Sequence, residues 1–73
     1  MRIERLVAMA NDIAAFFDAG QDKTESAKAI AYHLRRFWDP RMRRQIVEHN
    51  GAGGAGLRDS VRAAIGLLSD ESK

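Results

Sequence analysis

The chain has 73 residues, no cysteine and a net charge of +2. A chain of this length buries only about 60% of the surface that its unfolded form exposes, so its core is marginal. The lack of cysteine excludes disulfide bonds and thiolate metal sites, which leaves a partner subunit as the support we expect. No apolar run approaches the roughly 20 residues that a membrane span requires. We expect a single small helical domain over residues 1–73, located in the cytoplasm and without a signal peptide.

The positive charge is concentrated in one short window. Residues 35–44 hold five arginines and one aspartate, a net charge of +4, while the segments before and after this window each carry −1. Nine of the twelve basic residues are arginine, whose planar guanidinium group pairs with carboxylates better than a lysine does. The sequence therefore predicts one basic patch on a nearly neutral body.

The apolar spacing predicts an all-α fold, a small bundle of three main helices plus a weaker fourth, with no strand. The first helix covers about residues 2–19, and Gly20 ends it in a left-handed stop. Residues recurring every three or four positions give it one apolar face: Ile3, Leu6, Val7, Ala10, Ile13, Ala14 and Phe17, widened by Met9 and Phe16.

The second helix begins with a capping signal, since Asp22 is followed three positions later by Glu25. The link from the first helix is so short that we expect these two helices to form an antiparallel hairpin whose apolar faces cover each other. The face predicted for the second helix consists of Ala27, Ile30, Ala31, Leu34, Phe37 and Trp38.

A sharp corner is predicted where the second helix ends. Pro40 disfavours a helical conformation for Asp39, so this helix should stop at Trp38. Asp39 can then cap a third helix, in which Pro40 takes the first position because no amide donor is needed there. The third helix should run from about residue 40 to residue 49, with Met42 on its apolar side.

The glycine-rich stretch at residues 51–56 is best interpreted as a flexible connector. Gly51, Gly53 and Gly56 match the G-x-G-x-x-G dinucleotide fingerprint, but that motif requires a preceding strand, and here a helix precedes it. A fourth helix follows at about residues 57–68. It is the weakest, because Gly66 lies inside it, and it must dock on other helices to persist. Residues 69–73 are expected to fray.

The sequence offers no arrangement for catalysis or for metal binding. His33 and His49 lie sixteen positions apart without a cysteine or a Glu-x-x-His pair, which falls short of known metal sites. We expect His33 to lie on the flank of the second helix near Phe37, and His49 at the end of the third. No catalytic, cofactor-binding or metal-ligating residue is predicted, and we expect the chain not to be an enzyme.

The basic corner is the candidate binding site, because arginine and aromatic residues are enriched at protein interfaces. We consider two interpretations of Phe37 and Trp38: both rings close the core, or Trp38 stays partly exposed to a partner. The predicted partner-binding residues are Arg36, Phe37, Trp38, Asp39, Pro40, Arg41, Met42, Arg43 and Arg44.

A known family shares these residues. The run from Phe37 to Arg43, Phe-Trp-Asp-Pro-Arg-Met-Arg, with Leu-Val-Ala-Met-Ala-Asn at residues 6–11, resembles the delta subunit of NAD-dependent, molybdenum-containing formate dehydrogenases. Ile13, Phe16 and Phe17, together with His33 and Leu34, fit the same pattern. The resemblance covers residues 6–49.

This resemblance implies a non-catalytic accessory subunit of a cytoplasmic complex that oxidises formate and reduces NAD. The molybdenum cofactor, the iron–sulfur clusters, FMN and NAD would be held by other subunits. The small subunit would support the stability of the catalytic alpha subunit or the insertion of its cofactor. The sequence fits both a permanent subunit and a maturation factor.

A small helical nucleic-acid binder that uses the arginine-rich third helix is the alternative interpretation. Acidic flanks, the modest total charge and a one-residue corner argue against it, because helix-turn-helix proteins use turns of about three to four residues. For either interpretation, apolar surface meant for a partner favours self-association of the isolated chain.

Overall fold

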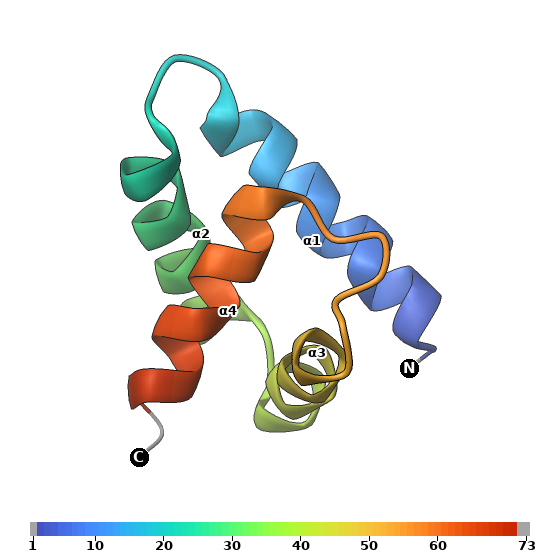
Figure 1. Cartoon of the computed structure of the whole chain (residues 1–73). Coiled ribbons are helices and arrows are strands. Elements are labelled where there is room, and N and C mark those ends of the chain that lie inside the picture. Colours follow the sequence, from blue (N-terminus) through green and yellow to red (C-terminus); the bar gives the residue numbers. More distant parts are fainter. Residues whose placement is uncertain (1, 72–73) are drawn as a thin grey trace.

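The structure, a computed structural model, describes residues 2–71. Its four helices are α1 (Ile3–Asp18), α2 (Lys23–Phe37), α3 (Pro40–Gly51) and α4 (Asp59–Glu71). No strand occurs among the described residues (Figure 1). The prediction of an all-α fold is therefore confirmed.

Local capping groups set the helix ends. The Asp22 side chain accepts a hydrogen bond from the Glu25 backbone amide at 2.9 Å and begins α2 as predicted. Gly20 turns the chain between α1 and α2 with φ of +92°, a conformation that glycine adopts without a steric penalty. Helix α4 continues past Leu68 to Glu71, so the tail that we expected to fray is helical through residue 71, and residues 72–73 lie outside the described part.

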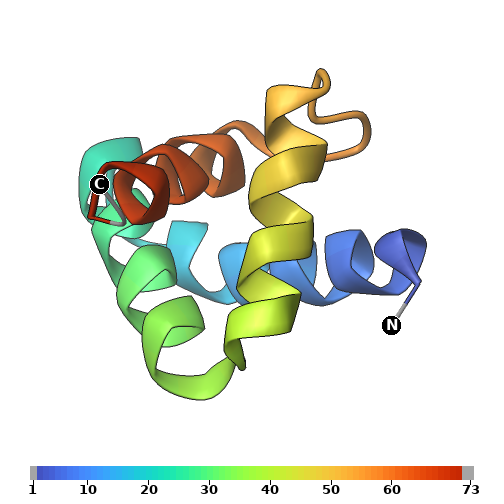
Figure 2. The same cartoon turned by 90° about the horizontal axis from the view of Figure 1, so that it is seen from below.

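The helix that seemed weakest in the sequence contacts every other helix. Helix α4 packs against α1, α2 and α3, and its contact with α2 is the most extensive of all helix pairs. The two helices lie side by side in Figure 1, whereas α3 is seen almost along its axis there and stands across α1 and α4 in Figure 2. The antiparallel pairing of α1 with α2 stays a prediction, since α2 makes its main contact with α4 instead.

The core draws side chains from all four helices. The small residues Ala10 and Ala14 on α1 let the neighbouring helices approach closely, while branched side chains fill the space between them. The buried apolar residues are Leu6, Ala10, Ala14, Ala27, Ile30, Ala31, Leu34, Trp38, Ile46, Val61, Ala64, Ile65 and Leu68. Four of them belong to α4, which explains why a helix with an internal glycine is stable in this setting.

Candidate interaction surface at the corner between α2 and α3

Two residues, Trp38 and Asp39, connect α2 to α3. The Asp39 side chain accepts a hydrogen bond from the Met42 backbone amide at 2.9 Å, and Pro40 occupies the first position of α3. The predicted cap and helix start are confirmed. The connection has two residues instead of one because α2 ends at Phe37.

Trp38 lies inside the molecule, with 5% of its surface exposed. Its backbone is extended, with φ of −92° and ψ of 140°, so the side chain leaves the helical register of α2. The indole joins the core cluster. The structure therefore bears out the interpretation in which the Trp38 ring closes the core, and it contradicts the one in which this residue is partly exposed to a partner.

Arg43 is also used inside the molecule. Its Nη1 donates hydrogen bonds to the carbonyl oxygens of Arg35, at 2.9 Å, and of Trp38, at 2.6 Å. Carbonyl groups in the last turn of a helix lack intrahelical donors, and a guanidinium group near them also complements the negative end of the helix dipole. Arg43 thus caps α2 from α3, while its contact with a partner stays a prediction.

The remaining corner residues divide into capping and surface groups. Asp39 and Pro40 are exposed but engaged in starting α3, while Met42 is half-buried and packs against the core. Four side chains are left at the surface, and we call them the exposed corner: Arg36, Phe37, Arg41 and Arg44. The guanidinium carbon of Arg36 lies 5.9 Å from the centre of the Phe37 ring, within the range of a cation–π contact.

A hollow adjoins the corner, between α3 and the last turns of α4. Its lining consists of Arg35, Pro40, Arg43, Arg44, Val47, Leu68 and Ser69. Arginine groups thus surround apolar side chains, a composition typical of protein interfaces.

The structure reveals a row of aromatic rings, of which Phe37 alone is predicted from the sequence to lie at a binding surface. The Phe16 and Phe17 rings lie edge to face at 5.3 Å, Phe17 lies 6.2 Å from His33, and His33 lies 4.7 Å from Phe37. We call these four residues the aromatic strip. The helical spacing indicated that His33 and Phe37 are neighbours, but only the packing of α1 beside α2 brings Phe17 to them.

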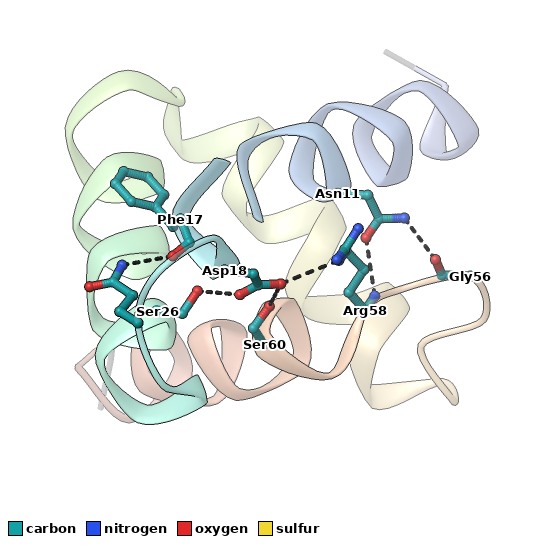
Figure 3. A network of polar contacts seen from close by, with 8 residues as sticks. Asn11, Phe17, Asp18, Ser26, Gly56, Arg58 and Ser60 are labelled. Atoms are coloured by element: carbon teal, nitrogen blue, oxygen red, sulfur yellow. Dashed lines mark hydrogen bonds and ion pairs between the residues drawn. The ribbon is translucent and has the colours of Figure 1, made fainter. Parts of the chain in front are cut away.

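A carboxylate joins three helices on another part of the molecule (Figure 3). Asp18, at the end of α1, accepts hydrogen bonds from the hydroxyl groups of Ser26 on α2 and Ser60 on α4, the latter at 2.9 Å. Arg58 pairs with it at 3.3 Å. The Ser26 hydrogen bond lowers the pKa of Asp18, burial opposes this shift, and Ser60 and the Arg58 charge reinforce it. The first turns of α2 and α4 therefore meet at the Asp18 carboxylate. Because the two helices also pack side by side, they run in the same direction from this point (Figure 1).

Side chains from α1 and α3 hold the glycine-rich connector through hydrogen bonds, and its flexibility stays a prediction. Asn11 on α1 donates to the Gly56 carbonyl oxygen at 2.8 Å and accepts from the Arg58 amide at 3.1 Å (Figure 3). Gly54 is buried with φ of +64°. Since α3 leads directly into this loop, the glycines form a helix-to-helix connection.

The two histidines take part in separate contacts. His33 belongs to the aromatic strip, whereas Nε2 of His49 lies 2.8 Å from the Ala55 carbonyl oxygen in the connector. Within residues that the structure describes, no cluster of three or more histidine, cysteine or acidic side chains could hold a metal ion. In the same part of the chain, no helix combines the length and the apolar character that crossing a membrane requires.

The geometry defines a small helical protein. Trp38, Asp39 and Arg43 hold its helices together at the corner, and the exposed corner forms a basic and aromatic surface. The family model described as the NADH-dependent formate dehydrogenase delta subunit, FdsD, matches residues 5–65, and the chain belongs to this family. The match continues through the connector and into α4, past the residues 6–49 that carry the resemblance in the sequence. Members are subunits of a formate dehydrogenase complex, which implies association with other subunits. No curated protein and no solved structure matches the chain.

Proposed function

We propose that this chain is a non-catalytic accessory subunit that docks on the catalytic alpha subunit and supports its stability or the insertion of its cofactor. The exposed corner is the observation that carries this proposal, because its four side chains have no role in starting or capping a helix. The molybdenum cofactor, the iron–sulfur clusters, FMN and the NAD site would lie on the other subunits, in the cytoplasm.

Charge supports docking through the exposed corner. Guanidinium groups on helix ends can form paired hydrogen bonds with carboxylates, and such charge-assisted contacts are stronger than neutral ones. Arg41 and Arg44 are exposed on α3, and Asp39 is the one acidic residue in the window 35–44. The complementary surface on the alpha subunit should therefore present aspartate or glutamate.

The test of docking is co-purification of the chain with the other subunits. We expect the double change Arg41→Glu/Arg44→Glu to reduce the amount of chain recovered with the alpha subunit. The matched control is Arg2→Glu/Arg5→Glu, which reverses two exposed charges at the start of α1, where acidic groups suit the helix dipole. Equal recovery of both double variants, each folded by circular dichroism, would remove the exposed corner from the interface.

The accessory role is tested on the alpha subunit itself. Complexes are purified from cells with and without the chain, and the yield of alpha subunit, its molybdenum content and formate-dependent NAD reduction are measured. A lower yield supports a stabilising role, whereas normal yield with low molybdenum supports cofactor insertion. Unchanged values for all three measurements contradict both roles.

Nucleic-acid binding through α3 is the alternative function. Because Arg43 is engaged with the end of α2, the arginines of α3 left for phosphate contacts are Arg41 and Arg44. Non-specific binding depends on the number of phosphates neutralised, so two arginines predict weak binding. A duplex-binding assay at low salt decides the matter: tight binding that weakens steeply with added salt would favour this alternative.

A further inference from the structure

The aromatic strip leaves two large apolar side chains in water. Phe16 is 77% exposed and Phe37 is 66% exposed, although Phe17 and His33 between them are partly buried. Single exposed apolar residues are common and need no explanation, but here successive ring contacts join the two phenylalanines into one surface. Burying such rings is favourable, since each phenylalanine can remove roughly 150 Å² or more from water.

The surface of the aromatic strip is concave at its Phe16 end, where a hollow lies between α1 and α2. Ile13, Phe16 and Phe17 on α1 and His33 on α2 line it, with Asp12 at its edge. The lining is mainly apolar, so an apolar side chain from another protein would find contacts on several sides. Interface residues that contribute most to binding fill pockets of this kind.

The other end of the strip is cationic. Arg36 stacks near the Phe37 ring at 5.9 Å, and Phe37 also belongs to the exposed corner with Arg41 and Arg44. An apolar centre with an arginine rim is the usual layout of a protein–protein interface. The two surfaces thus join at Phe37 into one contact area that spans α1, α2 and the beginning of α3.

We propose that the aromatic strip is the apolar centre of the docking site for the catalytic alpha subunit of the formate dehydrogenase complex, which inserts an apolar side chain between α1 and α2 and places carboxylates against Arg36. This inference rests on the proposed function, since it needs a partner subunit. Family membership supplies such a partner. A second copy of the chain fits less well, because it would bring an identical window of net charge +4 to the same rim.

Single changes in the strip test this proposal by co-purification with the other subunits. We expect Phe16→Ser and Phe37→Ser each to weaken association by about tenfold or more, as central interface residues do. The matched control is Leu67→Ser, which removes an apolar side chain that is 39% exposed on α4, outside the strip. Circular dichroism should show the helical content of the wild type for all three variants.

The outcomes separate this proposal from the proposed function. If the wild type fails to associate with the complex, the proposed function is wrong and the strip has no partner. If the wild type and all three variants associate equally, the chain is still a subunit but the strip is not its interface. That second result overturns the proposal.

A second measurement covers the case in which a serine variant fails to fold. Phe16 is replaced by the photo-reactive residue benzoylphenylalanine, which keeps an aromatic side chain at this exposed position. On illumination of the assembled complex we expect a covalent product with the alpha subunit. A product with a second copy of the chain only, a product with a different subunit only, or no product in a complex that contains the chain contradicts the proposal.

Discussion

The Nη1 atom of Arg43 lies 2.6 Å from the carbonyl oxygen of Trp38 and donates a hydrogen bond to it. The donor comes from α3 and the acceptor is the residue directly after α2, so this contact ties the two helices together. The same nitrogen also reaches the Arg35 carbonyl oxygen. The corner is therefore held by the side chain of Arg43, which the sequence alone does not distinguish from a surface arginine.

Replacing Arg43 with methionine should destabilise the fold. The change removes both hydrogen bonds to helix-end carbonyls, and hydrogen bonds to charged groups contribute about 1.5–3 kcal/mol to stability. We expect a loss of free energy of unfolding in this range, measured by urea denaturation. The control is Arg44→Met on the exposed side of α3, which should change stability by less than about 0.5 kcal/mol. Equal stabilities of the two variants would contradict the bracing role of Arg43.

The cap of α3 predicts a second, smaller effect. Asp39→Ala removes the acceptor for the Met42 amide, and losing such a cap typically costs about 1 kcal/mol. Asp39→Asn keeps an acceptor at the same place and should restore most of the stability. Thermal unfolding of the three proteins, followed by circular dichroism, measures the difference. An asparagine variant as unstable as the alanine variant would point to charge, not capping, as the role of Asp39.

Asp18 should make stability depend on pH in the acid range. Its pKa is lowered, first by the Ser26 hydrogen bond, so its stabilising effect is fully present above the ordinary value of 3.8 and is lost as the pH falls through the lower folded-state value. Asp18→Asn cannot ionise and should lack this effect. We expect the wild type to be more stable than Asp18→Asn at pH 6, with the gap closing below about pH 3.8 as the urea midpoints converge. A gap that stays constant down to pH 2 would show that ionisation of Asp18 is not involved.

Two glycines should respond to alanine in opposite directions. At Gly54, with φ of +64°, an added Cβ would lie 2.9 Å from Nε of Arg62 and 3.0 Å from Oδ1 of Asn50. These two atoms are hydrogen-bonded to each other at 3.1 Å, so Gly54→Ala should disturb the connector and destabilise the fold. At Gly66, inside α4, nothing lies within 4 Å of an added Cβ, and Gly66→Ala should stabilise the helix by up to about 1 kcal/mol. Urea denaturation of both variants gives the signs, and a stabilised Gly54→Ala would mean that the connector tolerates another conformation.

Local signals were sufficient for the helices and insufficient for their packing. Asp22 and the Asp39–Pro40 pair act within one turn of their own positions, which is why the starts of α2 and α3 could be predicted. The closure of the connector depends on Asn11, which contacts the Gly56 carbonyl oxygen 45 positions away. The spacing of apolar residues along the sequence does not indicate such a long-range polar contact.

The candidate site shows the same division. The basic window is visible in the sequence, but the sequence does not indicate different roles for its arginines. The fold distinguishes them: Arg43 caps α2, whereas Arg41 and Arg44 lie at the surface. Phe37 and Trp38 divide for a related reason. The predicted apolar face includes both rings, yet Phe37 is 66% exposed, whereas Trp38 follows the last helical residue and turns inward on an extended backbone.

The dependence of α2 on α4 has a consequence for proteolysis. Ile30 and Leu34 are covered by the last helix of the chain, which is joined to the rest only by the glycine-rich connector. A single cut in that connector would leave α4 held by non-covalent contacts alone, so that the core against α1 and α2 could open more easily. Such a nick should weaken recognition from a distance, without removing any residue of the contact area itself.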